Sequence, residues 1–143
     1  MTIIAGRAVT GTILREHQLS QSSWSASELE GVADAEELVL VISRAGRAAL
    51  RFPVWPVVVD GGLYVRSYLG VTTGWYRGVV ANPHQAIVLD DRDVDVLFEF
   101  VARTDAVNKT IDLAFLSKYS SFDYRDAMVE PAAVDATLRI LPG

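Results

Sequence analysis

Aromatic and basic side chains are concentrated in one stretch of the chain, residues 50–77, and together they could hold a planar anionic ligand. Tryptophan and tyrosine rings offer flat apolar surfaces against which a conjugated ring system can pack. Arginine side chains and the free N–H groups at the start of a helix can both hold an anionic group such as a phosphate. This stretch therefore contains the residue types that would bind a phosphorylated ring compound.

The candidate phosphate ligands come from two places in the sequence. Arg44, Arg47 and Arg51 flank one predicted turn, and Thr72 and Thr73 open a predicted helix. A structural role competes with this interpretation, because strand-end arginines often only solvate a surface and threonines often only cap a helix. There is no glycine-rich phosphate loop to favour a nucleotide. The sequence leaves both interpretations open.

The candidate ring-binding residues lie on one face of a predicted hairpin and on the helix that follows it. Arg66 on this face could stabilise negative charge developing on the ring. Either of two tyrosines could donate a proton to a substrate. A dimer interface or a covered core is the alternative, since these residue types are also common interface anchors. The candidates are Trp55, Arg66, Tyr68, Trp75 and Arg77 for ring binding, and Tyr68 or Tyr76 for proton donation.

The hairpin that would position these residues is predicted by alternation and by its turn. Its arms, 51–59 and 63–68, are rich in valine and aromatic residues, and Asp60-Gly61-Gly62 between them suits a two-residue turn. A two-residue turn places alternate residues on opposite faces. We expect an apolar inner face and a mixed aromatic and cationic outer face that carries the function. The inner face is Val54, Pro56, Val58, Leu63, Val65 and Ser67; the outer face is Pro53, Trp55, Val57, Tyr64, Arg66 and Tyr68.

The other elements indicate a mainly β protein with inserted helices. Turn residues and stretches of alternating or helical spacing predict six strands and about three helices, which fit an antiparallel sheet better than βαβ repeats. A polar and aromatic group near the end of the third helix, including Lys118 and Tyr119, is expected to tie that helix to the sheet. The predicted helices are 25–35, 72–81 and 105–119, and the predicted strands are 36–44, 51–59, 63–68, 85–89, 94–102 and 134–141.

Composition limits the classes of partner. A chain of 143 residues without an obvious linker predicts one domain, assigned to 24–143, preceded by an N-terminal arm over 1–23. The net charge of −5 argues against a nucleic-acid partner. No apolar run is long enough to span a membrane, and no metal-ligating pattern is evident. With no cysteine and no signal-peptide pattern, a cytoplasmic location is expected.

Several motifs resemble the split-barrel flavin-binding superfamily, which includes pyridoxamine-phosphate-oxidase-like proteins and deazaflavin-dependent nitroreductases. The chain looks most similar to a small uncharacterised bacterial split-barrel family within it. The resemblance covers about 24–142 and departs from the family pattern at Thr72-Thr73-Gly74, where a basic residue is common, and at Phe115, where tyrosine is typical. The matching motifs are Trp24, Val57 to Arg66, Trp75-Tyr76-Arg77, IDLAFLSKY at 111–119 and ATLRILP at 136–142.

The resemblance implies a fold, a cofactor and a partner. It implies a six-stranded antiparallel split β-barrel that forms a homodimer, with FMN or a deazaflavin bound in a cleft between two barrels. The corresponding activity is an oxidoreductase that transfers hydride to a small unsaturated, quinone-like or nitro substrate. The alternative is a cofactor-free split barrel whose aromatic cleft binds or cyclises a hydrophobic metabolite in natural-product tailoring.

Overall fold

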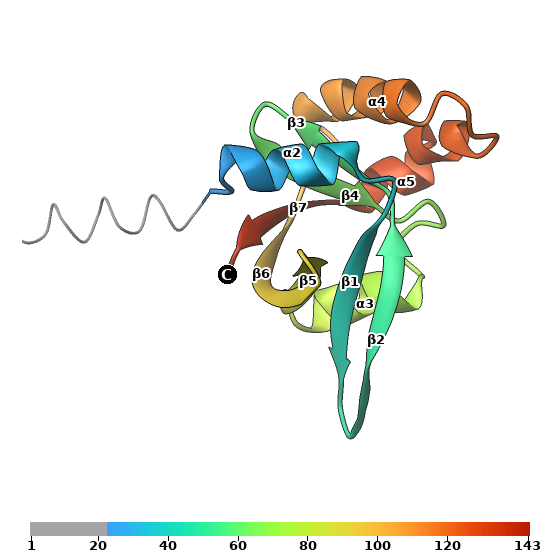
Figure 1. Cartoon of the computed structure of the whole chain (residues 1–143). Helices are drawn as coiled ribbons and strands as arrows, with labels where there is room; N and C mark the ends of the chain where they lie inside the picture. Colours follow the sequence, from blue (N-terminus) through green and yellow to red (C-terminus); the bar gives the residue numbers. More distant parts are fainter. Residues whose placement is uncertain (1–22) are drawn as a thin grey trace, which may run out of the picture.

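In the computed structural model, which describes residues 23–143, seven antiparallel strands curl into a half-barrel with helices packed outside it (Figure 1). The strand order is β2-β1-β5-β6-β7-β4-β3. The predicted arm over 1–23 lies outside the described residues except for Ser23. In chain order the elements are α2 (Ala26–Asp34), β1 (Leu38–Arg44), β2 (Arg47–Val54), β3 (Pro56–Val59), β4 (Gly62–Arg66), α3 (Gly74–Ala81), β5 (His84–Leu89), β6 (Arg92–Phe100), α4 (Val107–Lys118), the 3-10 helix η1 (Arg125–Val129), α5 (Pro131–Asp135) and β7 (Thr137–Pro142).

The predicted hairpin is confirmed as β3 and β4. Val57 pairs with Tyr64, so Asp60 and Gly61 form the two-residue loop. Both loop residues have positive φ angles, 48° and 79°, which is the backbone of a type I′ turn. This turn fixes the register and therefore sends alternate side chains to opposite faces as expected.

Replacing Gly61 by Ala is expected to lower the free energy of unfolding by about 1 kcal/mol, because an alanine is strained at positive φ. A Cβ added there would touch nothing, so the cost comes from the backbone alone. Gly31→Ala in the exposed helix α2 is the matched control, and we expect a gain of about 0.5 kcal/mol there. Urea unfolding of both variants measures the difference, and equal effects would contradict this explanation.

The prediction of a single strand over 51–59 is wrong. The chain forms two strands there, β2 and β3, so the sheet has seven strands instead of the predicted six. The chain breaks at Trp55: β2 pairs with β1, whereas β3 pairs with β4 at the other edge of the sheet. Pro53 and Pro56 flank the break. Proline has no N–H to donate, so it is tolerated on edge strands, and both β2 and β3 are edge strands.

The inner face of the hairpin belongs to the barrel core, as predicted. Val54, Leu63 and Val65 are buried in one cluster with side chains from the other strands. The prediction that the whole outer face carries the function is wrong. Helix α4 packs beside β3 (Figure 1). Val57 and Tyr64, in the middle of that face, are buried in a second cluster with side chains of α4. The expected working surface is therefore restricted to the ends of this face.

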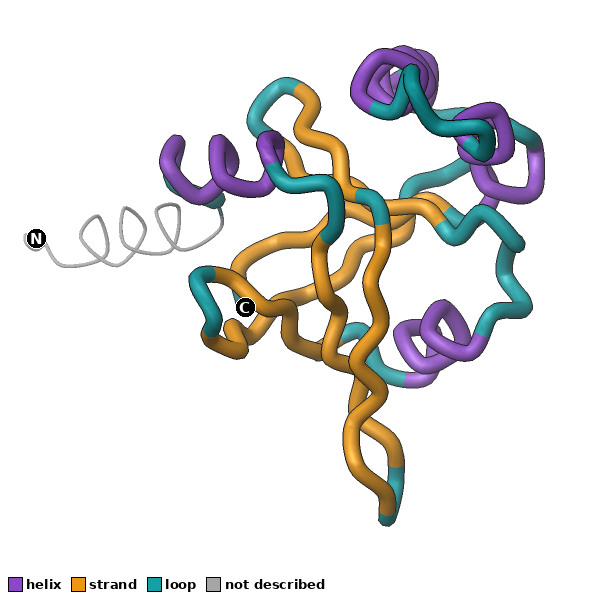
Figure 2. Tube along the Cα trace, turned by 45° about the vertical axis from the view of Figure 1, so that its right-hand side comes forward, coloured by secondary structure: helices purple, strands orange, loops and turns teal. Residues whose placement is uncertain are grey.

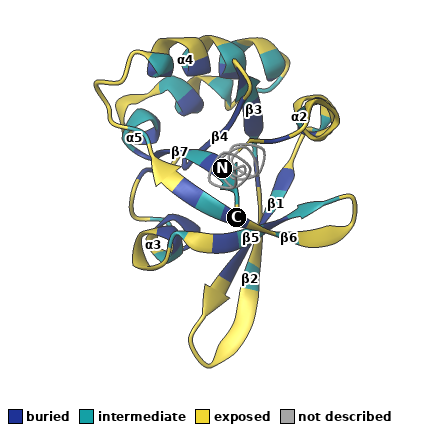
Figure 3. Cartoon of the chain, turned by 90° about the vertical axis from the view of Figure 1, so that its left-hand side faces the viewer, coloured by how far each residue is buried: buried dark blue, intermediate teal, exposed yellow. Residues whose placement is uncertain are grey.

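The β1–β2 hairpin projects from the body of the molecule (Figure 2). Most of β2 is exposed along the projection (Figure 3). The predicted strands 85–89 and 94–102 are confirmed as β5 and β6, which form a second hairpin whose loop residues, Asp90 and Asp91, both have positive φ. Phe100, at the end of β6, is 48% exposed.

The predicted helices are confirmed with small shifts at their ends, and η1 and α5 were not predicted. Helix α2 begins at a capping box in which Ser25 and Glu28 each bond the other's backbone N–H. None of the helices in the described part of the chain is both long and apolar enough to cross a membrane.

Candidate functional site: an aromatic cleft

A cleft of about 400 Å³ lies where the end of β2 meets the connection from β4 to α3. Its lining is mostly apolar and aromatic, as in small-molecule sites generally. The break at Trp55 turns the chain along one wall, and the segment from Arg66 to Trp75 forms another. The lining residues are Glu37, Phe52, Pro53, Val54, Trp55, Arg66, Ser67, Tyr68, Leu69, Thr73, Trp75, Tyr124 and Met128.

Several aromatic rings line the cleft. Trp75 is almost fully buried and lies 6.5 Å, between ring centroids, from Phe52. Trp55 stacks on Tyr119 with centroids 4.0 Å apart. Tyr68 is half exposed at the cleft. Of the predicted ring-binding residues, the structure thus brings Trp55, Tyr68 and Trp75 together in one cleft, which could accept a flat conjugated ring.

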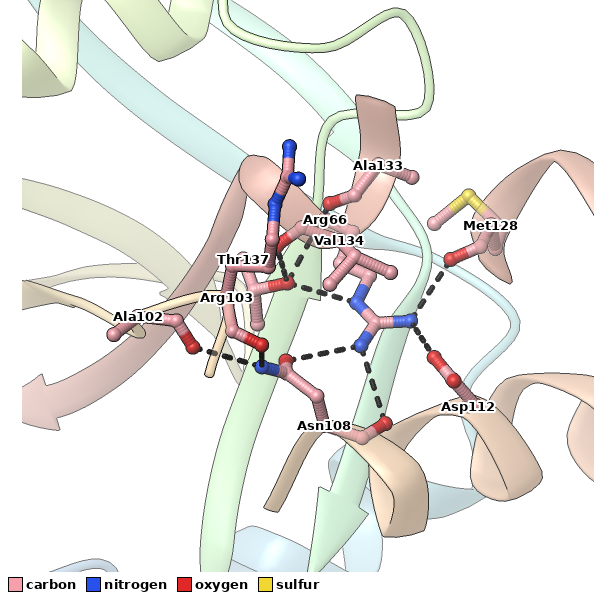
Figure 4. Close-up of polar contacts among 9 residues, drawn as sticks. All are labelled: Arg66, Ala102, Arg103, Asn108, Asp112, Met128, Ala133, Val134 and Thr137. Atoms are coloured by element: carbon pink, nitrogen blue, oxygen red, sulfur yellow. Dashed lines mark hydrogen bonds and ion pairs between the residues drawn. The ribbon is translucent and has the colours of Figure 1, made fainter. Parts of the chain in front are cut away.

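Arg66 also contributes to the lining, but its guanidinium is fully engaged with the protein (Figure 4). Its side chain is 0% exposed. All five N–H groups have acceptors: Nε donates to the Thr137 hydroxyl at 2.9 Å, Nη1 to the Asp112 carboxylate at 2.5 Å and to the carbonyl of Met128, and Nη2 to the side chain and carbonyl of Asn108. Burial lowers the pKa of Arg66 from its usual value, and the hydrogen bond and charge of Asp112 oppose that shift.

This arrangement corrects the role expected for Arg66. The guanidinium has no N–H left for the carbonyl groups of a ring in the cleft. It joins β4 to α4, η1 and β7 instead. The side chain is therefore a structural anchor behind the cleft.

The three arginines predicted to hold a phosphate do not line the cleft. Arg51 forms a bidentate ion pair with Asp93, with N–O distances of 3.2 and 2.8 Å. Arg44 donates from Nε to the carbonyl of Ala48 within the projecting hairpin. Arg44 and Arg47 form the last pair before the turn of the β1–β2 hairpin. They therefore lie at the tip of the hairpin, which projects from the body of the molecule.

The start of α3 does supply unsatisfied donors beside the cleft. Thr73 is the N-cap residue, but its hydroxyl pairs with that of Ser67 at 2.9 Å and does not cap the helix. Among the described residues, no acceptor bonds the N–H groups of Gly74, Trp75 or Tyr76. These groups carry the positive end of the helix dipole. Because Thr73 and Trp75 line the cleft, this end adjoins it.

The remaining predicted residues lie outside the cleft. Tyr76 is buried and packs edge-on against Trp75 and Phe100. Burial, and to a lesser extent the charge of Asp135, raises the pKa of Tyr76, so it is a poorer proton donor than an ordinary tyrosine. Thr72 and Arg77 are exposed at α3 and are not part of the lining. Of the two candidate tyrosines, only Tyr68 adjoins the cleft.

Sequence reasoning missed several lining residues. Phe52 and Leu69 are immediate neighbours of predicted site residues, so a wider window would have included them. Glu37 lies in the predicted strand 36–44 and is not among the candidate site residues. Tyr124 and Met128 come from the unpredicted region of η1, which carries no periodicity that would have placed it against β4.

The curled antiparallel sheet with helices packed outside it has the split-barrel fold of several solved structures. The heme storage protein HutZ of Vibrio cholerae is similar over 82% of this chain and 89% of its own, with a TM-score of 0.62 and 13% identity. A FAD-binding protein of Mesorhizobium loti has a TM-score of 0.55 and 20% identity over 84% and 89% of the two chains. An F420-H2-dependent reductase has a TM-score of 0.54 and 14% identity over 74% and 93%.

Residues 28–140 match the family described as "Uncharacterized protein conserved in bacteria (DUF2255)", and the chain belongs to that family. No curated protein matches the sequence. These three structures are 13–20% identical to this chain, so they show its fold alone. Flavin-binding, F420-dependent and heme-storage proteins all occur among them.

Proposed function

We propose that the cleft binds the ring of FMN or a deazaflavin, and that the protein is an oxidoreductase acting on a small unsaturated, quinone-like or nitro substrate. The observation that carries this proposal is a cleft with aromatic walls beside the unsatisfied N–H groups of α3. The presence of FAD-binding and F420-dependent proteins among those of similar fold supports it at the level of fold.

The residues of the cleft fit such a cofactor in two ways. Trp55, Trp75 and Phe52 offer apolar surface to the ring. The start of α3 offers donors to a phosphate, because free helix N–H groups favour anions, and the Ser67–Thr73 hydroxyl pair leaves one further O–H group. The cofactor when bound would supply the hydride chemistry. Tyr68, half exposed beside the cleft, is the residue we assign to proton donation to the substrate.

We further propose that a second copy of the chain covers the cleft. The large apolar side chains around it are exposed: Phe52 by 38%, Tyr68 by 52%, Leu69 by 61% and Tyr124 by 76%. Tyrosine and phenylalanine are enriched at protein interfaces. Sedimentation at micromolar concentration should give a dimer, and Leu69→Asp with Tyr124→Asp should give a monomer.

One observation favours the second candidate, a cofactor-free cleft for a hydrophobic metabolite. None of the three predicted phosphate-binding arginines lines the cleft, and Glu37 is its only charged lining residue without an ion-pair partner among the described residues. A neutral apolar ring would bind such a cleft without needing a cation. The two candidates therefore differ in whether the bound ligand carries a phosphate.

A matched pair of substitutions at Thr73 separates the candidates. Thr73→Asp places a carboxylate at the start of α3, where it favours the helix but repels a phosphate; Thr73→Asn has a similar shape and no charge. We expect Thr73→Asp to weaken FMN binding by about tenfold or more relative to Thr73→Asn. Lumiflavin, which has no phosphate, should bind both variants equally.

The outcomes of the titration are distinct. Tight binding of lumiflavin with no preference for FMN would favour the cofactor-free cleft.

The triple variant Arg44→Ala, Arg47→Ala and Arg51→Ala is a second control for the FMN titration. It should leave FMN binding unchanged, because these residues lie outside the cleft of this chain. A large loss of FMN binding in the triple variant would contradict the assignment of the phosphate to α3.

A further inference from the structure

Trp55, which lines the cleft, stacks on an aromatic side chain at the end of α4. Its ring is stacked on Tyr119, with a centroid distance of 4.0 Å and an angle of 2° between the planes. Phe122 contacts Trp55 edge-on at 5.0 Å. Parallel stacking leaves the opposite face of an indole available, and Trp55 is only half-buried. Tyr119 packs against one face of the Trp55 ring and therefore sets the plane of that ring.

The backbone beside Trp55 is held by the same end of α4. The carbonyl of Pro56 accepts hydrogen bonds from Lys118 Nζ at 2.8 Å and from the Tyr119 hydroxyl at 3.1 Å. Lys118 also donates to the carbonyl of Val32, and Tyr119 to that of Glu36. These bonds hold the point at which the chain leaves β2 and enters β3, and they join it to the end of α2.

We propose that Lys118 and Tyr119 are positioning residues that set the plane of Trp55 and thereby the affinity of the cleft for its ring ligand. The proposed effect on ligand affinity rests on the proposed function, whereas the proposed effect on the orientation of Trp55 does not. Neither residue lines the cleft itself. Their effect reaches the ligand through Trp55 and through the backbone at Pro56.

The environment of Lys118 makes this arrangement sensitive to pH. Burial lowers the pKa of Lys118 to about 8, and Asp34 at the end of α2 partly offsets the shift. The other charged groups nearby are Glu36 and Glu37, whose charges, after burial, raise the pKa of Tyr119. Loss of the proton weakens the bonds to both carbonyls and removes the attraction between the ammonium and the Tyr119 ring, 5.3 Å away.

Fluorine NMR of protein labelled with fluorotryptophan tests the orientation without any ligand. The chain has three tryptophans, and Trp55→Phe assigns the signal of Trp55. We expect Lys118→Met and Tyr119→Leu to move this signal and to leave those of Trp24 and Trp75 in place. Tyr119→Phe keeps the stacked ring and should move it least. Lys109→Met, at an exposed position of α4, is the control and should move none.

The pH profile adds a readout that a purely structural role would not give. The Trp55 signal of the wild-type protein should shift with a midpoint near pH 8, and this transition should be absent from Lys118→Met and present in Lys109→Met. An unmoved Trp55 signal in both Lys118→Met and Tyr119→Leu would overturn the proposal. So would a transition near pH 8 that persists in Lys118→Met.

FMN titration of the same variants tests the affinity part. Lys118→Met should bind FMN about fivefold more weakly than Lys109→Met, a factor that corresponds to about 1 kcal/mol. Equal FMN affinities of Lys118→Met and Lys109→Met would overturn the proposed effect of Lys118 on ligand binding. If the wild-type protein binds no FMN, the proposed function fails, while the NMR result still decides whether Lys118 and Tyr119 position Trp55.

Discussion

Replacing Arg66 by Met is expected to lower the free energy of unfolding by about 4 kcal/mol, the range seen when one partner of a buried ion pair is removed. Methionine fills much of the space but donates no hydrogen bond. The Asn108 side chain and the carbonyl of Met128 would lose a buried donor, and Asp112 would lose its cation. For a domain of this size, such a loss is a large part of the total stability.

Arg66→Lys is the informative comparison for this prediction. Lysine keeps the charge but has three donors and no planar fork, so it cannot bond Asp112, Asn108 and Thr137 together. We expect a loss of about 2 kcal/mol, between wild type and Arg66→Met. Urea unfolding measures both variants. A decrease in the free energy of unfolding below about 1 kcal/mol for Arg66→Met would show that the hydrogen bonds of Arg66 contribute little to stability.

Replacing Gly78 by Ala is expected to cost about 2 kcal/mol, although alanine is the better helix former. Gly78 lies in α3 where the helix crosses β1. A Cβ there would lie 2.5 Å from Cγ2 of Ile42, a branched side chain that cannot easily rotate away. The helix would have to shift and would carry Trp75 with it, so ligand binding in the cleft should weaken as well.

Gly74→Ala in the same helix is the matched control. A Cβ at Gly74 meets nothing within 4 Å, so we expect no loss of stability. Shortening the obstructing residue should restore tolerance: in the Ile42→Ala background, Gly78→Ala should cost much less than in the wild-type protein. Similar effects of Gly78→Ala and Gly74→Ala in thermal unfolding would contradict the close packing of α3 on β1.

The strands were predictable where local chemistry decides the structure. Asp60-Gly61 fixes the register of β3 and β4, and alternation then divides the side chains between two faces. Which face is covered depends on α4, which lies far along the chain, and local patterns do not contain that information. The break at Trp55 had a local signal in Pro53 and Pro56, because proline within a sheet is confined to edge strands, strand starts and bulges.

Only part of the candidate site was predictable from the sequence. Trp55, Tyr68, Thr73 and Trp75 meet in the cleft because the hairpin and the start of α3 follow one another in the chain. Arg66 had a suitable position on the outer face, but its partner Asp112 is distant in sequence, so its structural role became visible only in the fold. Arg44, Arg47 and Arg51 are close to the other candidate site residues in sequence, but in the structure they lie outside the cleft.

The visible absorption and fluorescence spectrum of the freshly purified protein, followed by titration with FMN and with a deazaflavin cofactor at one salt concentration, tests the central claim most directly. We expect a bound chromophore or micromolar uptake of one of the two, with the fluorescence of Trp55 and Trp75 quenched as the cleft fills. A protein that carries no chromophore and takes up neither cofactor would contradict the oxidoreductase assignment and leave the aromatic cleft to a cofactor-free ligand.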